Sequence, residues 1–248
     1  DILAIMNYCE NNLIRFYSVP HVRNYIKRQL QLELLGEVPV LSIRTEPLQN
    51  PVNRLAKRLF DLTFSSLFLL TIFPFMYLIV GLIIKITSPG PIFFKQERNG
   101  ENGKIFKCYK FRSMKVNALS DSLQATKNDP RKTKFGNFLR KSNLDELPQF
   151  INVFKGEMSI VGPRPHMLKH TEEYSQLINK YMMRHLVKPG ITGWAQVTGY
   201  RGETKELSQM EGRVRRDLWY IENWTFLLDI RIMIKTVTNM FRGEKNAY

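Results

Sequence analysis

The chain has little cysteine and little negative charge. Its 248 residues include only Cys9 and Cys108, with no partner spacing for a zinc site and no disulfide framework. Such cysteine usage is typical of a reducing compartment. The 22 Asp and Glu residues stand against 37 Lys and Arg, which gives a formal net charge of +15. We therefore expect anionic partners, whether nucleic acid, anionic lipid or phosphorylated substrates.

A signal peptide with a small-residue cleavage site is also absent, and the first residue, Asp1, stands in the middle of a pattern. We expect the chain to be part of a longer protein. Internal repeats and low-complexity tracts are missing too. The 44% of hydrophobic residues is sufficient for one large or two small folded domains.

Residues 1–53 are predicted to be the C-terminal part of an upstream α/β domain. A short apolar run at 13–17 predicts a strand, helical spacing predicts a helix within 19–36, and residues 38–43 predict a second strand. These elements are too few to close a core of their own. Pro and Asn in the stretch TEPLQNPVN indicate a linker, so a second domain is expected over 54–248.

The longest uncharged stretch runs over 23 residues, from Leu62 to Ile84. A helix of that length measures about 34 Å at about 1.5 Å per residue, enough to cross the hydrocarbon core of a bilayer. Pro74, near its middle, removes a backbone hydrogen bond and kinks the helix. Basic residues flank both ends: Arg54, Lys57 and Arg58 before it, and Lys85, Lys95 and Arg98 after it.

The positive-inside rule would place both basic flanks on the cytoplasmic face. We therefore predict a re-entrant helix hairpin over residues 57–86 that is broken at Pro74 and returns to the side it entered from. A straight span with a tolerated proline and a buried core helix are the alternatives.

Further elements follow this segment. Two apolar and aromatic runs within 88–114, separated by two Asn-Gly pairs, predict a β-hairpin. Residues 115–134 predict a polar surface loop, and a helical run begins at Phe135. The basic stretch 213–241 suits the headgroup layer of a membrane, with a core-facing helix as the alternative. Its apolar stripe comprises Leu218, Ile221, Trp224, Leu228 and Ile232.

Two adjacent carboxylates, Asp145 and Glu146, lie in the stretch RKSNLDELPQF. The spacing from Asn143 to Glu146 matches the capping box at a helix N-terminus, where acidic residues are also stabilised by the helix dipole. The spacing alone favours this structural role. A catalytic role for the pair is the alternative.

The tetrapeptide GPRP holds Arg164 between two prolines on a stiff, extended backbone. A guanidinium placed in this way can bind a phosphate through two nitrogens. A surface turn with an incidental arginine is the simpler alternative for the tetrapeptide in isolation.

Several motifs occur in a fixed order: KRLFD at 57–61, the uncharged segment with its central proline, YKFRSM at 109–114, LDELPQ at 144–149, NVFKGEMSIVGPRP at 152–165 and KPGITGWAQV at 188–197. Together they resemble the bacterial sugar transferase family, the monotopic polyprenyl-phosphate phosphoglycosyl transferases. The resemblance extends from Lys57 almost to the C-terminus. It also identifies residues 1–53 with the nucleotide-binding-like domain that precedes the catalytic domain in larger members.

The resemblance implies an α+β, mostly helical fold with a re-entrant membrane helix, interfacial amphipathic helices, a small β-hairpin and an N-terminal Rossmann-like remnant. The family commonly has Ser-Pro at the break of the membrane helix, whereas this chain has Phe73-Pro74. Ser65, Ser66 or a neighbouring element would then have to supply the missing hydroxyl.

The resemblance also implies the site. Asp145 would be the nucleophile, and Glu146, together with Asp145, would bind Mg²⁺. Asp217 matches an acidic position of the family and could equally form an internal ion pair. Surface salt bridges and solvated charge remain the alternatives for the basic residues. The substrate-binding residues implied are Arg112, Arg140, Arg164, Pro163 and Asp217.

The implied reaction moves a hexose 1-phosphate from a UDP-sugar to undecaprenyl phosphate. The sequence is most similar to the members that transfer glucose 1-phosphate. The reaction proceeds through a phosphosugar-aspartate intermediate, releases UMP and starts exopolysaccharide assembly at the cytoplasmic face of the bacterial inner membrane. Membrane lipid is an expected partner, nucleic acid is not, and a homodimer is allowed. Galactose 1-phosphate transfer, transfer of an N-acetylated sugar 1-phosphate, a relative without activity and a non-enzymatic, membrane-anchored anion-binding module are the alternatives.

Overall fold

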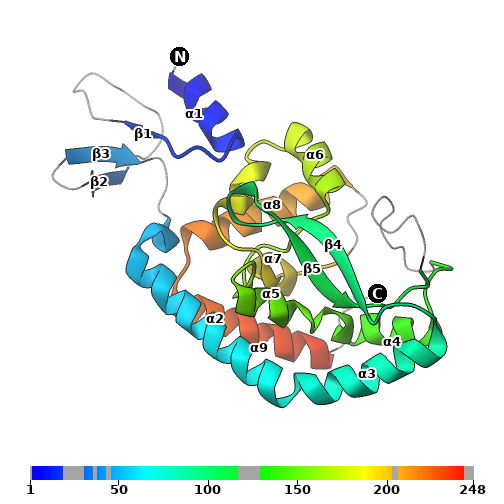
Figure 1. Cartoon of the computed structure of the whole chain (residues 1–248). Helices are drawn as coiled ribbons and strands as arrows, with labels where there is room; N and C mark the ends of the chain where they lie inside the picture. The colour runs from blue at the N-terminus through cyan, green and yellow to red at the C-terminus, as the bar shows by residue number, and fades with distance from the viewer. Residues whose placement is uncertain are drawn as a thin grey trace.

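Helices make up most of the structure, a computed structural model that describes residues 2–18, 31–35, 38–42, 46–116, 129–202 and 206–242. Figure 1 shows helices α2 and α3 along one side of the molecule, with the other elements packed on their inner side. The helices are α1 (Ile2–Asn11), α2 (Pro51–Thr71), α3 (Phe73–Thr87), α4 (Lys134–Lys141), α5 (Gln149–Lys155), α6 (Leu168–Leu177), α7 (Trp194–Val197), α8 (Leu207–Glu222) and α9 (Phe226–Arg242).

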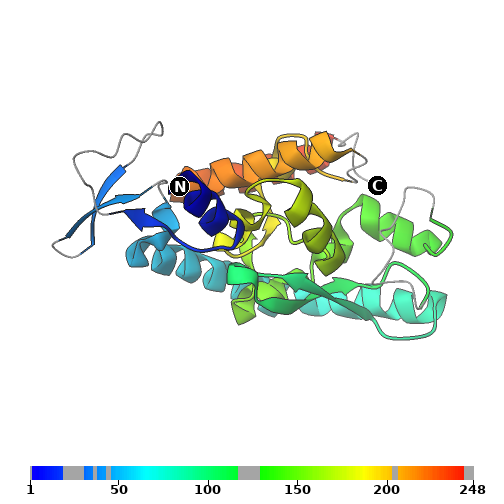
Figure 2. The same ribbon diagram turned by 90° about the horizontal axis from the view of Figure 1, so that it is seen from above.

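The strands of the described residues form three small sheets. They are β1 (Tyr17–Ser18), β2 (Gln31–Leu35), β3 (Val38–Ser42), β4 (Phe93–Asn99), β5 (Ile105–Phe111), β6 (Ser159–Val161) and β7 (Gly190–Thr192). Strands β1, β3 and β2 lie in that order, β4 pairs with β5, and β6 pairs with β7. Only the β6–β7 pair is parallel. Figure 2, viewed from above, shows the β4–β5 hairpin and α8 on opposite sides of α6.

The hairpin predicted within 88–114 is confirmed. Strands β4 and β5 are antiparallel, and Gln96 pairs with Cys108. Asn102 and Gly103 both have positive φ, 54° and 74°, at the turn between them. Asn and Gly tolerate this left-handed conformation, so the second of the two Asn-Gly pairs makes the tight reversal. The predicted helical run from Phe135 is also confirmed, as α4.

Helices α2 and α3 form one apolar pair that is bent by 56° at Ile72. Within the described residues no single helix has the length and apolarity to cross a bilayer, whereas this bent pair has both. Pro74 lies in the first turn of α3. Near the bend the Thr71 hydroxyl donates to the Leu67 carbonyl at 2.6 Å, a contact that favours helix bending. Ser65 instead bonds to the Leu62 carbonyl, about two turns earlier.

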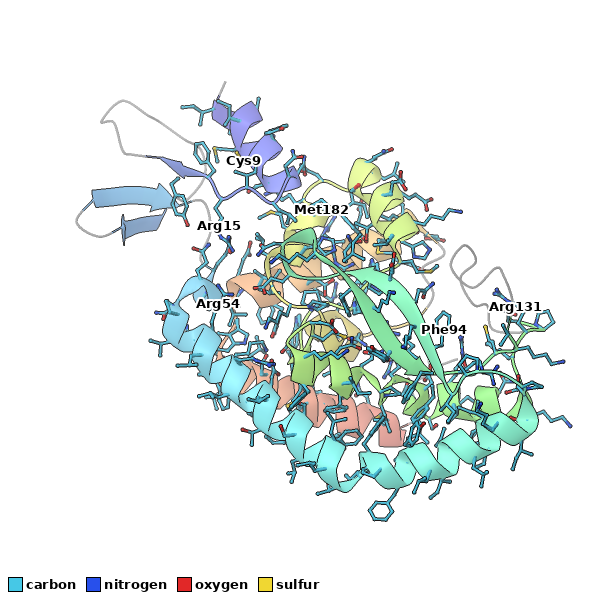
Figure 3. All side chains as sticks on the ribbon, in the orientation of Figure 1. Cys9, Arg15, Arg54, Phe94, Arg131 and Met182 are labelled. Atoms are coloured by element: carbon cyan, nitrogen blue, oxygen red, sulfur yellow. The ribbon has the colours of Figure 1, made fainter. Side chains whose placement is uncertain are left out.

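The outer side of the α2–α3 pair is apolar. Figure 3 shows side chains projecting from this side, where none of the described elements covers them. Among the large apolar side chains that follow Val52 in α2 and α3, the most exposed are Leu70 at 79%, Ile86 at 75% and Phe75 at 69%. An uncovered apolar surface of this kind is rare in proteins that do not bind a partner or a membrane.

The inner side of α2 is held by polar contacts of the KRLFD motif. Lys57 Nζ lies 2.5 Å from Asp229 Oδ2 in α9, and both side chains are buried. Tyr220 and Trp224 also donate to the Asp229 carboxylate. One turn further along α2, Asp61 Oδ1 accepts a hydrogen bond from the Ile160 amide at 2.9 Å. These contacts fix α2 against α9 and β6.

Two predictions for residues 1–53 are wrong in the described part. Residues Gln31–Leu35 form strand β2 instead of the end of a helix, because each of them pairs with β3, for example Leu32 with Leu41. Leu13 has a φ of 61° in a turn after α1, and the predicted strand is reduced to Tyr17–Ser18. The strand predicted at 38–43 is confirmed over Val38–Ser42. Residues 19–30 lie outside the described residues.

The interfacial interpretation of the stripe in 213–241 is also wrong. The stretch is broken between Glu222 and Phe226 into α8 and α9. Ile221, Trp224 and Ile232 are at most 4% exposed and belong to the main core, together with residues of α5 and β6. The periodicity indicated that one face of this stretch is buried. The structure shows that this face packs against other parts of the protein instead of facing lipid. The opposite face of α9 is exposed, with Leu227 at 77%.

We predict that Lys57→Met lowers the free energy of unfolding by about 3 kcal/mol, because it leaves the buried Asp229 carboxylate without a countercharge. Denaturation in detergent micelles measures the change. Lys85→Met, at the exposed end of α3, is the matched control and should lower it by less than about 1 kcal/mol. Equal losses in the two variants would contradict a stabilising role for the buried pair.

Candidate active site

A cavity of about 620 Å³ lies between the β4–β5 hairpin and the C-terminal half of the chain. Because side chains alternate across a strand, one face of the hairpin contributes Phe94, Gln96 and Arg98 from β4, with Cys108 and Lys110 from β5. The opposite walls come from the turn that carries Asp145 and Glu146, from the segment after Pro163, and from α8. The cavity thus brings together segments that are far apart in sequence.

Asp145 and Glu146 lie in the short 3₁₀ helix η3 (Leu144–Glu146). The capping box predicted here is wrong. Asn143 has a φ of 58° in the left-handed region, and its side chain makes no capping bond. Its Oδ1 accepts a hydrogen bond from Arg201 Nη2 at 2.6 Å instead. The left-handed residue turns the chain sharply after α4, so that both carboxylates line the cavity.

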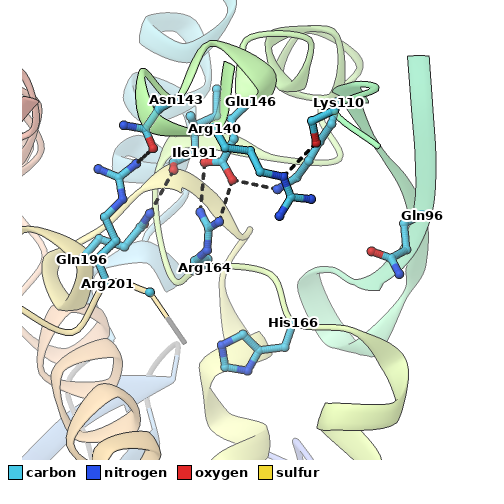
Figure 4. A network of polar contacts seen from close by, with 12 residues as sticks. Gln96, Lys110, Arg140, Asn143, Glu146, Arg164, His166, Ile191, Gln196 and Arg201 are labelled. Carbon is cyan, nitrogen blue, oxygen red and sulfur yellow. Dashed lines mark hydrogen bonds and ion pairs between the residues drawn. The ribbon is translucent and has the colours of Figure 1, made fainter. Parts of the chain in front are cut away.

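The Glu146 carboxylate binds two cations, as Figure 4 shows. Arg164 donates through Nη1 to Oε2 at 3.0 Å and through Nη2 to Oε1 at 2.6 Å. Lys110 Nζ donates to Oε1 at 2.7 Å. Burial alone would raise the pKa of Glu146, but the charges of Arg164 and Lys110 outweigh it and hold the pKa well below its usual range. Glu146 is therefore ionised and fixed in orientation.

Asp145 has a different environment although it is adjacent in sequence. Burial raises the pKa of Asp145 to about 6, against the attraction of the Lys110 charge, and the negative charge of Glu146 adds to the increase. Arg140 and Arg164 are further nearby cations. At neutral pH Asp145 is an ionised carboxylate that is only 7% exposed and faces the cavity. Such a group is suited to nucleophilic attack.

Arg164 depends on the backbone of its GPRP segment. The Gly190 amide donates to the Pro163 carbonyl at 2.9 Å, next to the parallel β6–β7 pair. A Cβ on Gly190 would collide with the Gly162 amide, so these glycines permit the close approach of the two segments. Pro163 is buried and does not line the cavity, so it positions Arg164 from behind.

Not all of the other predicted site residues line the cavity. Arg140 lines the cavity and donates from Nε to the Ser113 hydroxyl at 2.8 Å. Arg112 also lines it, but its two terminal nitrogens donate to the Ser88 and Pro89 carbonyls at the end of α3. Asp217 does not line the cavity. It forms the buried internal ion pair that the sequence left open, with Arg184 at 2.7 Å.

Sequence reasoning missed Lys110, Arg201, Arg213 and His166 as cavity residues. The signal for Lys110 was present, because it lies inside YKFRSM and shares a strand face with Cys108. His166 directly follows GPRP. Arg201 and Arg213 come from regions whose position depends entirely on tertiary structure.

Asp145 and Glu146 are the residues that would hold a Mg²⁺ ion, and a substrate would have to complete its coordination. Among the described residues no group of three or more His, Cys, Asp or Glu side chains could hold a metal by themselves. Mg²⁺ usually keeps several waters and binds through one or two carboxylates together with substrate phosphates. Asp145 and Glu146 provide two carboxylates, and Glu146 Oε2 accepts only one of the three cationic donors.

The cavity thus holds two carboxylates among clustered cations, an arrangement suited to phosphorylated ligands. Residues 52–243 match the family described as bacterial sugar transferase. The chain is 52% identical over 233 residues to the UDP-glucose:undecaprenyl-phosphate glucose-1-phosphate transferase of Escherichia coli (strain K12). The aligned region covers 93% of this chain and 49% of that protein.

Proteins of the same name from other bacteria are similarly related. The protein from Xanthomonas campestris pv. campestris is 48% identical over 237 residues, with 93% of this chain and 48% of that protein covered. The protein from Klebsiella pneumoniae is 49% identical over 233 residues, with 93% and 49% covered. The chain spans about half the length of these curated relatives. It belongs to the bacterial sugar transferase family, as its motifs predicted.

We predict that Asp145→Asn makes the protein more stable at pH 8, by an amount on the order of 2 to 3 kcal/mol. The folded-state pKa of this carboxyl is raised, so ionisation opposes folding. The contribution of Asp145 to stability should fall as pH rises from about 4 to about 6 and then stay level. Unfolding midpoints at pH 4 and pH 8 measure the difference, which should be small at pH 4.

Glu146→Gln is the matched control with the opposite sign. The pKa of Glu146 is lowered in the fold, so its charge stabilises the protein above the unfolded-state pKa and this contribution is lost as pH falls. The glutamine variant should therefore be less stable at pH 8. Stabilisation by both substitutions at pH 8 would contradict the assigned charge states.

Proposed function

We propose that this chain transfers glucose 1-phosphate from UDP-glucose to undecaprenyl phosphate and releases UMP, the reaction named for its relatives. The observation that carries the proposal is the placement of Asp145 in a cavity among Lys110, Arg140 and Arg164. Both substrates are anions, which accounts for this concentration of cations. The product would be the lipid-linked sugar that starts exopolysaccharide assembly.

In the first half-reaction an Asp145 carboxylate oxygen attacks the β-phosphorus of UDP-glucose. The bond from that phosphorus to the oxygen bridging the two phosphates breaks, and its electron pair leaves with UMP. Asp145 needs no base, because its carboxyl is ionised above pH 6. Lys110, Arg140 and Arg164 reduce the repulsion between the two anions. Mg²⁺ bound by Glu146 and Asp145 would supply further charge neutralisation at the transferring phosphoryl group.

In the second half-reaction an oxygen of undecaprenyl phosphate attacks the phosphorus of the aspartyl ester. The bond between this phosphorus and the Asp145 oxygen breaks, which restores the carboxylate and gives a lipid diphosphate-sugar. The separation into two steps allows a soluble donor and a lipid acceptor to use one site in turn. Two hydrogen bonds anchor Arg164 on Glu146, an arrangement that positions the cationic wall for both steps.

The acceptor requires a location at the membrane, and the α2–α3 pair is suited to it. We propose that the pair enters one leaflet of the bacterial inner membrane and returns, with the cavity on the cytoplasmic face. Its bend of 56° and its uncovered apolar outer side support this arrangement. The bend lies at Ile72, directly before Phe73-Pro74, and the neighbouring Thr71 hydroxyl bonds to the Leu67 carbonyl.

We predict that Asp145→Asn lowers the rate of UMP release from UDP-glucose by at least about 1000-fold, because an amide oxygen is a poor nucleophile. Membranes, undecaprenyl phosphate and Mg²⁺ are present in the assay. Lys141→Met, at an exposed position of α4, is the control and should retain activity. Unchanged turnover in Asp145→Asn would remove the nucleophile assignment, and a panel of UDP-sugars tests the donor.

We predict that cysteines introduced at Asn53 and Thr87, on opposite ends of the α2–α3 pair, react with a membrane-impermeant maleimide from the same side of the inner membrane. The re-entrant arrangement returns the chain to the side it came from. Inverted and right-side-out vesicles distinguish the sides, and a cysteine at Leu70 near the bend should be protected. Labelling of the two end positions from opposite sides would show a straight span.

A further inference from the structure

Arg164 and Arg213 line the cavity, and Arg184 contacts the lining residue His166. The three arginines differ in their partners. Arg164 pairs with Glu146, and Arg184 pairs with Asp217 at 2.7 Å. Arg213 in α8 is 6% exposed and makes no ion pair with any carboxylate in the part of the chain that the structure describes. Asp217 lies one turn further along the same helix but binds Arg184. An unpaired buried charge is costly unless a ligand of opposite charge binds to it.

The contacts of Arg213 leave one nitrogen directed at a histidine. Its Nε donates to the Tyr200 carbonyl at 3.0 Å and its Nη2 to the Gly202 carbonyl at 2.9 Å. Nη1 lies 3.4 Å from Nε2 of His166. Burial and the charges of Arg184 and Arg164 lower the pKa of Arg213 to about 10, so the group is still a cation at neutral pH. Carbonyl contacts orient this charge without neutralising it.

The tautomer of His166 follows from its other nitrogen. Nδ1 lies 2.5 Å from Arg184 Nη1 and 2.6 Å from the Tyr181 hydroxyl. A guanidinium nitrogen can only donate, and Nδ1 lies much closer to one than Nε2 does, at 2.5 Å against 3.4 Å. Nδ1 is therefore the acceptor, and the proton of the neutral ring is on Nε2. Burial, with the neighbouring charges of Arg184 and Arg213, holds the pKa of His166 well below its usual range, which keeps the ring neutral.

Nε2–H of His166 and Nη1–H of Arg213 are therefore two donors that face each other. Neither can accept a hydrogen bond from the other, so both require an acceptor that the described part of the chain does not provide. Both residues line the cavity that contains Asp145. In Figure 4, Arg164 lies between Glu146 and His166, so His166 lies beyond the Glu146 carboxylate along this wall.

The position of these donors along the hairpin indicates which substrate they meet. Met167, the residue after His166, forms a backbone β-bridge with Arg98. Arg98 lies at one end of the hairpin face that lines the cavity. Phe94 marks the other end, about 13 Å away at about 3.3 Å per residue. That end adjoins the α2–α3 pair, because the ring of Phe93 lies 5.5 Å from that of Tyr77 in α3. The donors thus lie at the end away from the proposed membrane helices.

We propose that Arg213 Nη1 and His166 Nε2 bind an anionic phosphate oxygen of the soluble donor, namely the nucleotide phosphate that leaves as UMP. This inference rests on the proposed function, in which Asp145 attacks the neighbouring phosphate. A phosphate oxygen supplies both the acceptor and the negative charge that the two donors lack. Negative charge increases on this group as the bond to the transferred phosphate breaks, so the contacts also strengthen during the reaction.

The test uses two substitutions of His166 that divide the functions of its ring. His166→Asn keeps an acceptor near the Nδ1 position for Arg184 and removes the Nε2 donor. His166→Gln keeps an amide donor near the Nε2 position and removes the acceptor. Calorimetry of the detergent-solubilised chain measures binding of UMP, UDP and uridine, and unfolding midpoints confirm that each variant is folded.

We expect His166→Asn to weaken binding of UMP and UDP by about tenfold or more, the effect of one hydrogen bond to a charged group. Uridine binding should be unchanged, and His166→Gln should stay within about threefold of the unsubstituted protein for all three ligands. Arg213→Met should weaken UMP and UDP binding at least as much as His166→Asn.

Unchanged UMP binding in a folded His166→Asn variant would overturn the inference, as would an equal loss of uridine binding, which would place the nucleoside at this position. An equal loss in His166→Gln would show that the histidine acts only through its structure. If the unsubstituted chain neither binds UMP nor releases it from UDP-glucose, the proposed function itself fails. Turnover by the unsubstituted chain with normal UMP binding in His166→Asn refutes this inference alone.

Discussion

The carboxylate of Glu146, held between Arg164 and Lys110, is the interaction on which the site depends. It joins three segments, the hairpin strand β5, the turn at η3 and the GPRP segment, into one wall. A buried carboxylate without these cations would be strongly destabilising, and each cation without the carboxylate would repel the other. The left-handed turn at Asn143 and the close glycine contacts behind Pro163 have the common effect of bringing these charges together.

Two adjacent carboxylates acquire opposite properties from this arrangement. Glu146 receives the direct hydrogen bonds and stays ionised, whereas Asp145 is buried without them and has a raised pKa. Environments that separate the pKa values of neighbouring acids are typical of catalytic pairs. Here the division gives one carboxylate that organises the cations and one that is oriented toward the cavity. The two adjacent carboxylates therefore acquire their different pKa values only in the folded state.

The charge of +15 indicated anionic partners, but only the fold distinguishes available cations from occupied ones. Arg112 holds the end of α3, and Arg184 is neutralised by Asp217. Lys57 is bound to Asp229 in the core. Arg213 has no carboxylate partner among the described residues, and it lies beside His166 at the cavity. The distribution of countercharges, and not the number of basic residues, therefore determines where an anion can bind.

The sequence by itself determined the family, the proline-broken apolar segment, the β4–β5 hairpin and α4, because local signals such as Asn102-Gly103 and Pro74 act through the backbone of a few residues. Tertiary structure decided the rest. Gln31–Leu35 became a strand by pairing with β3, the stripe on α8 and α9 entered the core, and Asn143 bound Arg201 instead of capping a helix. Periodicity reports that one face of a segment is buried, but the covering partner is set by residues far away in sequence. For the same reason the sequence identified Asp145, Glu146 and Arg164, whereas Lys110, His166 and Arg213 emerged only when the fold placed them around one cavity.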